Sequence, residues 1–173
     1  MKHTLDFDTI AEEFLSNRNF QRISRESHHG ITRMEHSMRV AKYVYKISKK
    51  LKLDYKSATR AAIAHDFFSV EEFGKCRGLI QGVVHPDIAL SNAMGEFSLN
   101  KVEQNAIASH MFPLNMTLPK SKEAWVLTAV DKVVAIYEYF SYKFSYTKVT
   151  SKVSNAFSFM GILCFNILTM GHK

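Results

Sequence analysis

Several histidines of this sequence occupy positions that should face the interior of a helical protein. His36 lies four residues before Val40, on a stripe of apolar residues that repeats at helical spacing. His65 follows a group of alanines at three, four and seven residues, and His110 follows Ile107 in the same way. Taken singly, each is most simply explained as a hydrogen-bonded core residue. Several such histidines in one chain suggest a shared role.

Two aspartates strengthen the case for shared chemistry. Asp66 directly follows His65, and Asp131 lies among apolar residues of a long helical pattern. Burying a carboxylate without a partner is costly, so such a group should be paired or bound to a cation. Neutral imidazole nitrogens and carboxylate oxygens suit divalent first-row metals. The combination predicts a metal centre.

The composition is that of one helical domain with a hydrophobic core. The chain has 173 residues, of which 46% are hydrophobic and 23% charged, which argues against general disorder. Its three prolines and seven glycines are too few for the many tight turns of a sandwich or barrel. We therefore expect an all-α fold.

Capping signals place the histidines on helices. Thr32 and Glu35 have the spacing of a capping box, which predicts a helix that carries His36 and continues to about residue 52. Asp54 should begin the next helix, which ends near His65 and Asp66.

Further signals place the remaining elements. Asn100 and Glu103 repeat the capping pattern before a helix that reaches His110, and a long helix is expected over 121–143. A short helix is expected over 8–17. We predict a long loop or irregular segment over 69–84, followed by a helix that begins at Pro86.

The order of these residues resembles a known family. His36, the pair His65-Asp66 and Asp131 resemble the H…HD…D signature of the HD-domain superfamily of metal-dependent phosphohydrolases. The resemblance covers about residues 28–143. It is carried by the phrases HSMRVA (36–41), AAIAHD (61–66), HPDIAL (85–90), ASHMFP (108–113) and AVDKV (129–133). It implies a compact all-α bundle of about six to seven helices. Outside the matched range we expect an N-terminal helical extension over 1–27 and an apolar C-terminal helix over 144–173.

The resemblance also implies the ligands of the metals. One divalent ion would be bound by His36, His65, Asp66 and Asp131. His85 and His110 match the additional histidines of dinuclear members, including the HD-type hydrolases of diadenosine tetraphosphate. They would bind a second ion together with a bridging Asp66. A single metal remains the alternative. The family implies iron or manganese in the cell, and nickel or zinc can replace them during purification.

The implied reaction is hydrolysis at phosphorus. Two cations about 3.5–4 Å apart lower the pKa of a water between them and hold a phosphoryl oxygen. His65, Asp66 and Lys132 are the expected catalytic residues. His29, Arg39 and Lys132 are the expected contacts with substrate. Alternatively, Arg39 belongs to a basic outer helix face and His29 to an exposed loop.

The expected substrate is a nucleotide or another small phosphorylated compound with a phosphoanhydride or phosphomonoester bond. The formal net charge of +7 suits an anionic partner. His65-Asp66 is followed by Phe67, Phe68 and Ser69 rather than by Ile-Gly-Lys, which argues against the cyclic-di-GMP branch. One alternative is a metal-containing nucleotide-binding or sensory module without turnover. Single-stranded nucleic acid is a less favoured partner, because the aromatic residues do not alternate with basic ones.

The remaining features concern the location and partners of the protein. Its two cysteines do not form a disulfide framework, and the N-terminal residues lack the apolar run of a secretory signal, so we expect a cytoplasmic protein. Residues 153–172 contain no Lys, Arg, Asp or Glu. Their polar residues and helical apolar stripe favour a helix packed on the domain, on a second copy or on another partner, in preference to a membrane.

Overall fold

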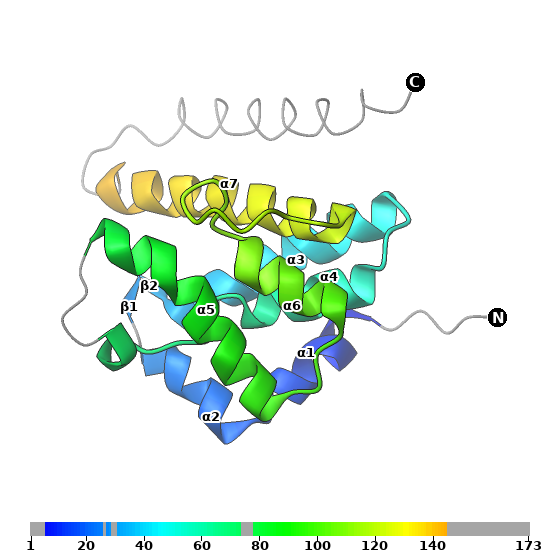
Figure 1. The fold of residues 1–173 in the computed structure, drawn as a ribbon, viewed down its shortest axis with the longest axis horizontal. Helices are drawn as coiled ribbons and strands as arrows, with labels where there is room; N and C mark the ends of the chain where they lie inside the picture. Colours follow the sequence, from blue (N-terminus) through cyan, green and yellow to red (C-terminus); the bar gives the residue numbers. More distant parts are fainter. Residues whose placement is uncertain (1–5, 26, 29–30, 74–77, 145–173) are drawn as a thin grey trace. The chain divides into compact units, whose positions relative to one another are not determined.

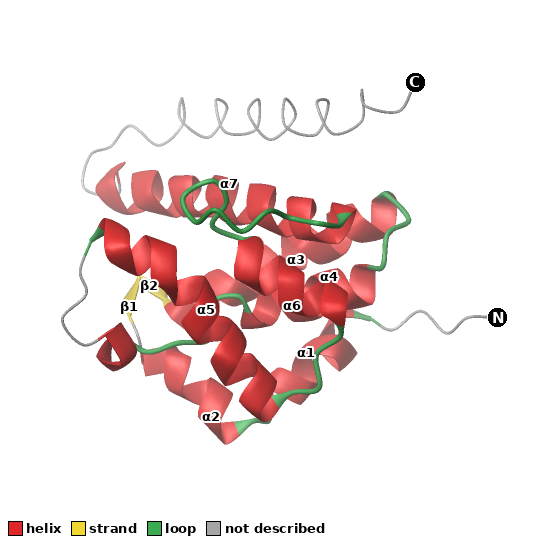
Figure 2. Ribbon diagram, in the orientation of Figure 1, coloured by secondary structure: helices red, strands yellow, loops and turns green. Residues whose placement is uncertain are grey.

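The computed structural model describes residues 6–25, 27–28, 31–73 and 78–144. Within them the fold is all-α, as predicted, with seven α-helices and one pair of two-residue strands (Figures 1 and 2). The α-helices are α1 (Phe7–Leu15), α2 (Arg18–Gln21), α3 (Arg33–Lys50), α4 (Tyr55–Ala64), α5 (Leu79–Glu96), α6 (Lys101–Ser109) and α7 (Lys122–Phe144). Two 3₁₀ helices, η1 (Arg22–Arg25) and η2 (Val70–Phe73), and the antiparallel strands β1 (Ser27–His28) and β2 (Ile31–Thr32) complete it.

The predicted capping residues begin the helices that carry the site. At the start of α3, Thr32 Oγ1 accepts the Glu35 N–H at 3.1 Å, and the Glu35 carboxylate accepts the Thr32 N–H at 2.7 Å. Asn100 and Glu103 form the same reciprocal pair at the start of α6. The Asp54 side chain accepts the Ser57 N–H at the start of α4. These starts are as predicted, and each satisfies backbone donors that the helix itself leaves unpaired.

Helix α4 lies at the centre of the fold. It packs against α1, α3, α5 and α6 (Figure 1), and all its residues from 57 to 64 are buried. This explains its run of small residues, because a helix surrounded by others must allow several close approaches. The helix ends at Ala64, so His65 and Asp66, which follow it directly, are held in the interior.

Helix α5 corrects the prediction for residues 69–84. The helix begins at Leu79 rather than at Pro86, which lies inside it. Gly78, with φ of 64°, is the position that requires a glycine before the helix. Gly82 is helical, and a Cβ there would lie 2.7 Å from Leu114 Cδ2, so this glycine reflects close packing rather than a loop. His85 consequently lies on a helix.

The chain divides within α7 into two units, residues 1–132 and 133–173. Every predicted metal ligand belongs to the first unit. The predicted domain boundaries at 27/28 and 143/144 stay predictions. Among the described residues, no helix has the length and apolar character needed to cross a bilayer. The uncharged segment 153–172 lies outside the described residues, as does its predicted helix.

Candidate metal centre

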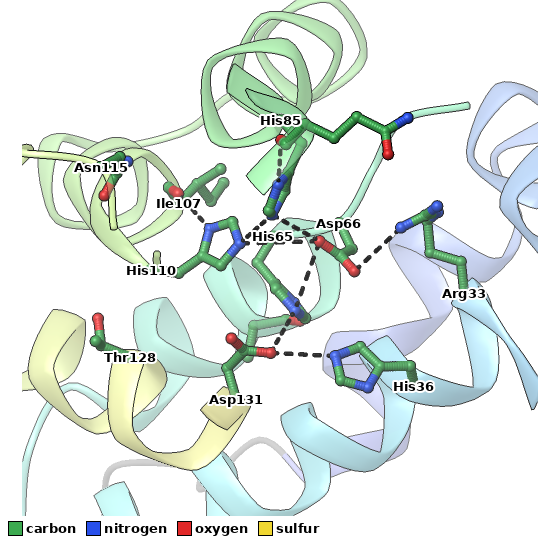
Figure 3. Close-up of polar contacts among 12 residues, drawn as sticks. Arg33, His36, His65, Asp66, His85, Ile107, His110, Asn115, Thr128 and Asp131 are labelled. Carbon is green, nitrogen blue, oxygen red and sulfur yellow. Dashed lines mark hydrogen bonds and ion pairs between the residues drawn. The ribbon is translucent and has the colours of Figure 1, made fainter. Parts of the chain in front are cut away.

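The six predicted ligands come together in the interior of the first unit (Figure 3). Each exposes between 0% and 9% of its surface, although they are spread over 96 positions of the sequence. They are His36 on α3, His65 and Asp66 at the end of α4, His85 on α5, His110 at the end of α6 and Asp131 on α7.

One group of ligand atoms surrounds Asp131 Oδ1. This oxygen lies 3.1 Å from His36 Nε2 and 3.4 Å from His65 Nε2. Nitrogen and oxygen ligands that each lie about 2.1 Å from a shared cation are about 3.0–3.4 Å from one another. His36, His65 and Asp131 therefore form a set that can hold a metal ion.

A second group surrounds Asp66 Oδ1. This oxygen lies 3.4 Å from His85 Nε2, 3.8 Å from His110 Nε2 and 4.0 Å from His65 Nε2. His65, Asp66 and His110 also form a set that can hold a metal ion. Because His65 is within reach of both carboxylates, the two groups adjoin.

Backbone contacts fix the tautomers of three of the imidazoles. The Nδ1 atoms of His65, His85 and His110 lie 2.7, 3.0 and 2.7 Å from the carbonyl oxygens of Ala62, Gln81 and Ile107. A carbonyl oxygen only accepts, so each Nδ1 carries the hydrogen and donates it. In the neutral ring, Nε2 then presents its lone pair to the centre, as in metal-binding histidines.

These lone pairs lack donors among the described residues. His65 Nε2 is buried without a hydrogen-bond partner, and its 3.4 Å contact with Asp131 does not meet hydrogen-bond geometry. The Nε2 atoms of His85 and His110 face each other at 2.8 Å. If both rings are neutral, two lone pairs meet with no hydrogen between them. A cation beside these nitrogens would satisfy them, so the donor set fits a divalent metal.

The pKa directions agree with neutral rings at this pair. Burial, together with the neighbouring His85 and His65, lowers the pKa of His110 to about 3. Burial also lowers the pKa of His85, more than Asp66 raises it. Near neutral pH both rings are therefore uncharged and available as ligands.

The carboxylates favour a positive charge at the centre. Burial alone would raise the pKa of Asp66, but His65, His85 and Arg33 lower it well below its usual range. The pKa of Asp131 is also lowered, against the effect of burial, by His36 and His65. Conversely, the two carboxylates raise the pKa of His65 despite its burial. Ionised carboxylates at this depth call for a cation.

Arg33 is a site residue that the sequence analysis missed. It is the first residue of α3 and is buried, and its Nη1 lies 3.4 Å from Asp66 Oδ2. Its position three residues before His36 places it on the same helix face, which was the available signal. Charged residues are rarely buried, so the pattern of apolar spacing gave no reason to place it inside.

The three residues predicted to contact substrate have different surroundings. Lys132 Nζ donates to the carbonyl oxygen of His110 at 2.9 Å, which links α7 to the end of α6. Arg39 is half-buried on α3, one turn after His36. His29 lies outside the described residues. Contact of these three side chains with substrate, and a catalytic role of Lys132, stay predictions.

A family profile decides the relationship of this chain. The profile described as HD domain matches residues 33–136, which is more than half of the sequence and contains all six ligands. The chain belongs to the HD-domain family. Members of this family are generally metal-dependent phosphohydrolases that bind divalent ions. No curated protein and no solved structure matches this HD-domain chain.

Proposed function

We propose that this HD-domain protein hydrolyses a phosphoanhydride or phosphomonoester bond of a nucleotide with the help of two divalent metal ions. The observation that carries the proposal is the convergence of unpaired imidazole lone pairs on two buried, ionised carboxylates. Such an interior is unfavourable for a purely structural core and is well suited to cations.

The proposed ligands follow the two groups of atoms. His36, His65 and Asp131 would hold one ion, and Asp66, His85 and His110 would hold the other, with Asp66 shared between them. The proximity of His65 Nε2 to both carboxylates supports adjacent ions. When bound, such a pair of ions lowers the pKa of a water molecule and polarises a phosphoryl oxygen.

The protein contributes orientation and charge. The carbonyl groups of Ala62, Gln81 and Ile107 hold the rings of His65, His85 and His110 so that Nε2 points inward. Burial keeps His85 and His110 neutral, so they compete little with protons for a cation. We further propose iron or manganese as the cellular metals, and His29, Arg39 and Lys132 as contacts with substrate.

The two histidines beyond the basic signature support a dinuclear member as the nearest functional type. His85 and His110 occupy the positions at which such members carry additional ligands. Diadenosine tetraphosphate and related dinucleoside polyphosphates are therefore the first substrates to test, beside nucleoside mono-, di- and triphosphates.

The test combines metal content with turnover. Metal-free full-length protein is loaded with Mn²⁺ or with Fe²⁺ under low oxygen, and phosphate release is measured over the nucleotide panel. We expect turnover only with metal, and its loss in Asp66→Asn. The matched control is Asp87→Asn, which changes an exposed carboxylate of α5 and should keep full activity.

Failure would be informative in two ways. If the protein binds two ions but turns over no member of the panel, the proposed hydrolase activity on nucleotides is wrong. Tight nucleotide binding without product would instead identify a metal-containing binding or sensory module.

A further inference from the structure

The buried guanidinium of Arg33 faces the side of Asp66 that points away from the histidines (Figure 3). Its Nη1 lies 3.4 Å from Asp66 Oδ2, and its centre lies 3.7 Å from the centre of the Phe68 ring. Phe68 is itself buried and lies 5.0 Å, ring to ring, from His85. The guanidinium is thus held between an aromatic face and a ligand carboxylate.

The two oxygens of Asp66 have different partners. Oδ1 lies nearest to the Nε2 atoms of His85 and His110, at 3.4 and 3.8 Å. Oδ2 is the oxygen that Arg33 contacts. The terminal torsion of an aspartate is broad and roughly two-fold, so the side chain alone does not fix this orientation.

Stabilisation of the fold does not by itself explain why Arg33 is buried. Its Nε is buried with no hydrogen-bond partner among the described residues, and an unpaired buried donor is unfavourable. Because that atom has almost no exposed surface, it is also badly placed to reach a substrate. Within the described part of the chain, the ionic and ring contacts of the side chain are with Asp66 and with Phe68, which follows Asp66 by two residues.

We propose that Arg33 is a positioning residue that holds Asp66 Oδ2 and thereby directs Oδ1 towards His85 and His110. This inference rests on the proposed metal centre and extends it. Partners of ligating groups orient those groups, and their loss weakens metal binding. The planar guanidinium can lie flat on Phe68 while its edge meets the carboxylate, which an ammonium group cannot do.

The role predicts unequal effects on the two groups of ligands. The group of Asp66, His85 and His110 depends directly on the orientation that Arg33 sets, because Asp66 Oδ1 lies nearest to those two histidines. The other group depends on it only through the shared Asp66, because its remaining atoms surround Asp131 Oδ1. Loss of Arg33 should therefore weaken the binding of one ion much more than the binding of the other.

In the experiment, metal-free full-length protein is titrated with Mn²⁺, and binding is monitored by calorimetry and by electron paramagnetic resonance. We expect Arg33→Met to weaken Mn²⁺ binding at one of the two sites by about 10- to 100-fold and to weaken it much less at the other. The variant Arg33→Lys, which keeps the charge, should lose less. Circular dichroism establishes whether each variant is folded. If Arg33→Met does not fold, the Mn²⁺ affinities of Arg33→Lys are compared with those of the wild type instead.

Arg60→Met is the matched control. Arg60 is also buried, but it pairs with Glu103 on α6 rather than with a predicted ligand. Its replacement should destabilise the fold and leave both Mn²⁺ affinities unchanged. The affinities are measured at a temperature where the variant is folded.

Three results would overturn the inference. Unchanged Mn²⁺ affinities in Arg33→Met would exclude a positioning role. Tighter Mn²⁺ binding would show that Arg33 acts as an opposing charge. A raised KM with normal metal affinities and normal kcat would make it a contact for substrate. If wild type binds two ions without hydrolysing any nucleotide, the proposed function fails while the affinity test of Arg33 still stands.

Discussion

At the scale of single residues, the candidate metal centre depends on histidine ring nitrogens that carry no hydrogen. The backbone takes the Nδ1 hydrogens of His65, His85 and His110, which leaves lone pairs at the centre of a buried cluster. Asp66 and Asp131 supply the negative charge. Each residue is unremarkable alone, and together their nitrogen and oxygen atoms form a donor set that fits a metal ion.

Removing one ligand should remove one ion. We expect His110→Phe, which keeps an aromatic ring of similar size, to reduce the metal content from two ions per chain to one. The reason is that His110 belongs only to the group around Asp66. Elemental analysis of the reloaded protein measures this directly.

The neighbouring buried residue Thr128 provides the control. Its hydroxyl donates to the carbonyl oxygen of Ser109 rather than to a predicted ligand. Thr128→Val should retain two ions. Two ions in His110→Phe would show that His110 is not a ligand.

A second buried charge cluster serves the fold rather than the site. Arg60 on α4 donates to Glu103 on α6 at 2.8 Å, to the Ser98 carbonyl at 3.0 Å and to Glu13 on α1. We expect Arg60→Met to lower the free energy of unfolding by about 3–5 kcal/mol, because Glu103 is left buried and unpaired. Urea denaturation of the metal-free protein measures the change.

Arg60 also pairs with an exposed carboxylate, Glu13, which can be compared with the buried Glu103. The Glu13 side chain is 47% exposed, so solvent screens its pairing with Arg60. Glu13→Gln should change stability by no more than about 1 kcal/mol. Equal losses for Arg60→Met and Glu13→Gln would contradict the assigned difference between buried and exposed partners.

At the scale of elements, helix ends place the ligands. His65 and His110 directly follow the last residues of α4 and α6, and Arg33 and His36 lie in the first turn of α3. The starts of these helices could be predicted because a cap is a local arrangement of a few residues. The predicted start of α5 at Pro86 was wrong. A glycine such as Gly82 indicates a loop by its residue type, whereas in the structure Gly82 lies inside the helix and close to the Leu114 side chain.

The cap of α6 should contribute measurable stability. Asn100 accepts the Glu103 N–H at 2.9 Å, and its amide donates to Ser57 Oγ on α4 at 2.8 Å. We expect Asn100→Ala to lower the free energy of unfolding by about 1–2 kcal/mol. Lys101→Ala, an exposed change at the next position, should have little effect. If Asn100→Ala and Lys101→Ala are equally stable in urea, the stabilising role of the Asn100 cap is wrong.

At the scale of the whole molecule, metal binding and folding should be coupled. The ligands come from five helices or helix ends and meet only in the folded first unit, so a metal ion binds the native state preferentially. At a free concentration 100 times Kd, one such ion stabilises the fold by about 2.7 kcal/mol.

Metal removal should therefore lower the melting temperature. For a chain of this size we expect the Tm of metal-loaded protein to fall by about 5–10 °C per ion on chelation. Differential scanning calorimetry with and without a chelator tests this. Asp66→Asn should show a smaller difference, and an unchanged Tm in wild type, with metal demonstrably bound beforehand, would contradict the coupling.

The sequence by itself determined the helical class and the caps of α3, α4 and α6. These follow from short-range rules, because caps and helical faces depend on residues within a few positions of each other. The ordered phrases along the chain carried the resemblance to the HD-domain family, and that resemblance implied the six candidate ligands. Metal binding by these residues stays a prediction that the buried cluster supports.

Only the tertiary structure decided which candidate ligands lie next to one another and which residue contacts Asp66. His36 meets Asp131 across 95 positions of sequence, and His85 meets His110 across 25. The orientation of Asp66 depends on Arg33, 33 positions earlier. Such contacts arise from the packing of whole helices around α4, and no local pattern specifies which oxygen of a carboxylate faces which partner.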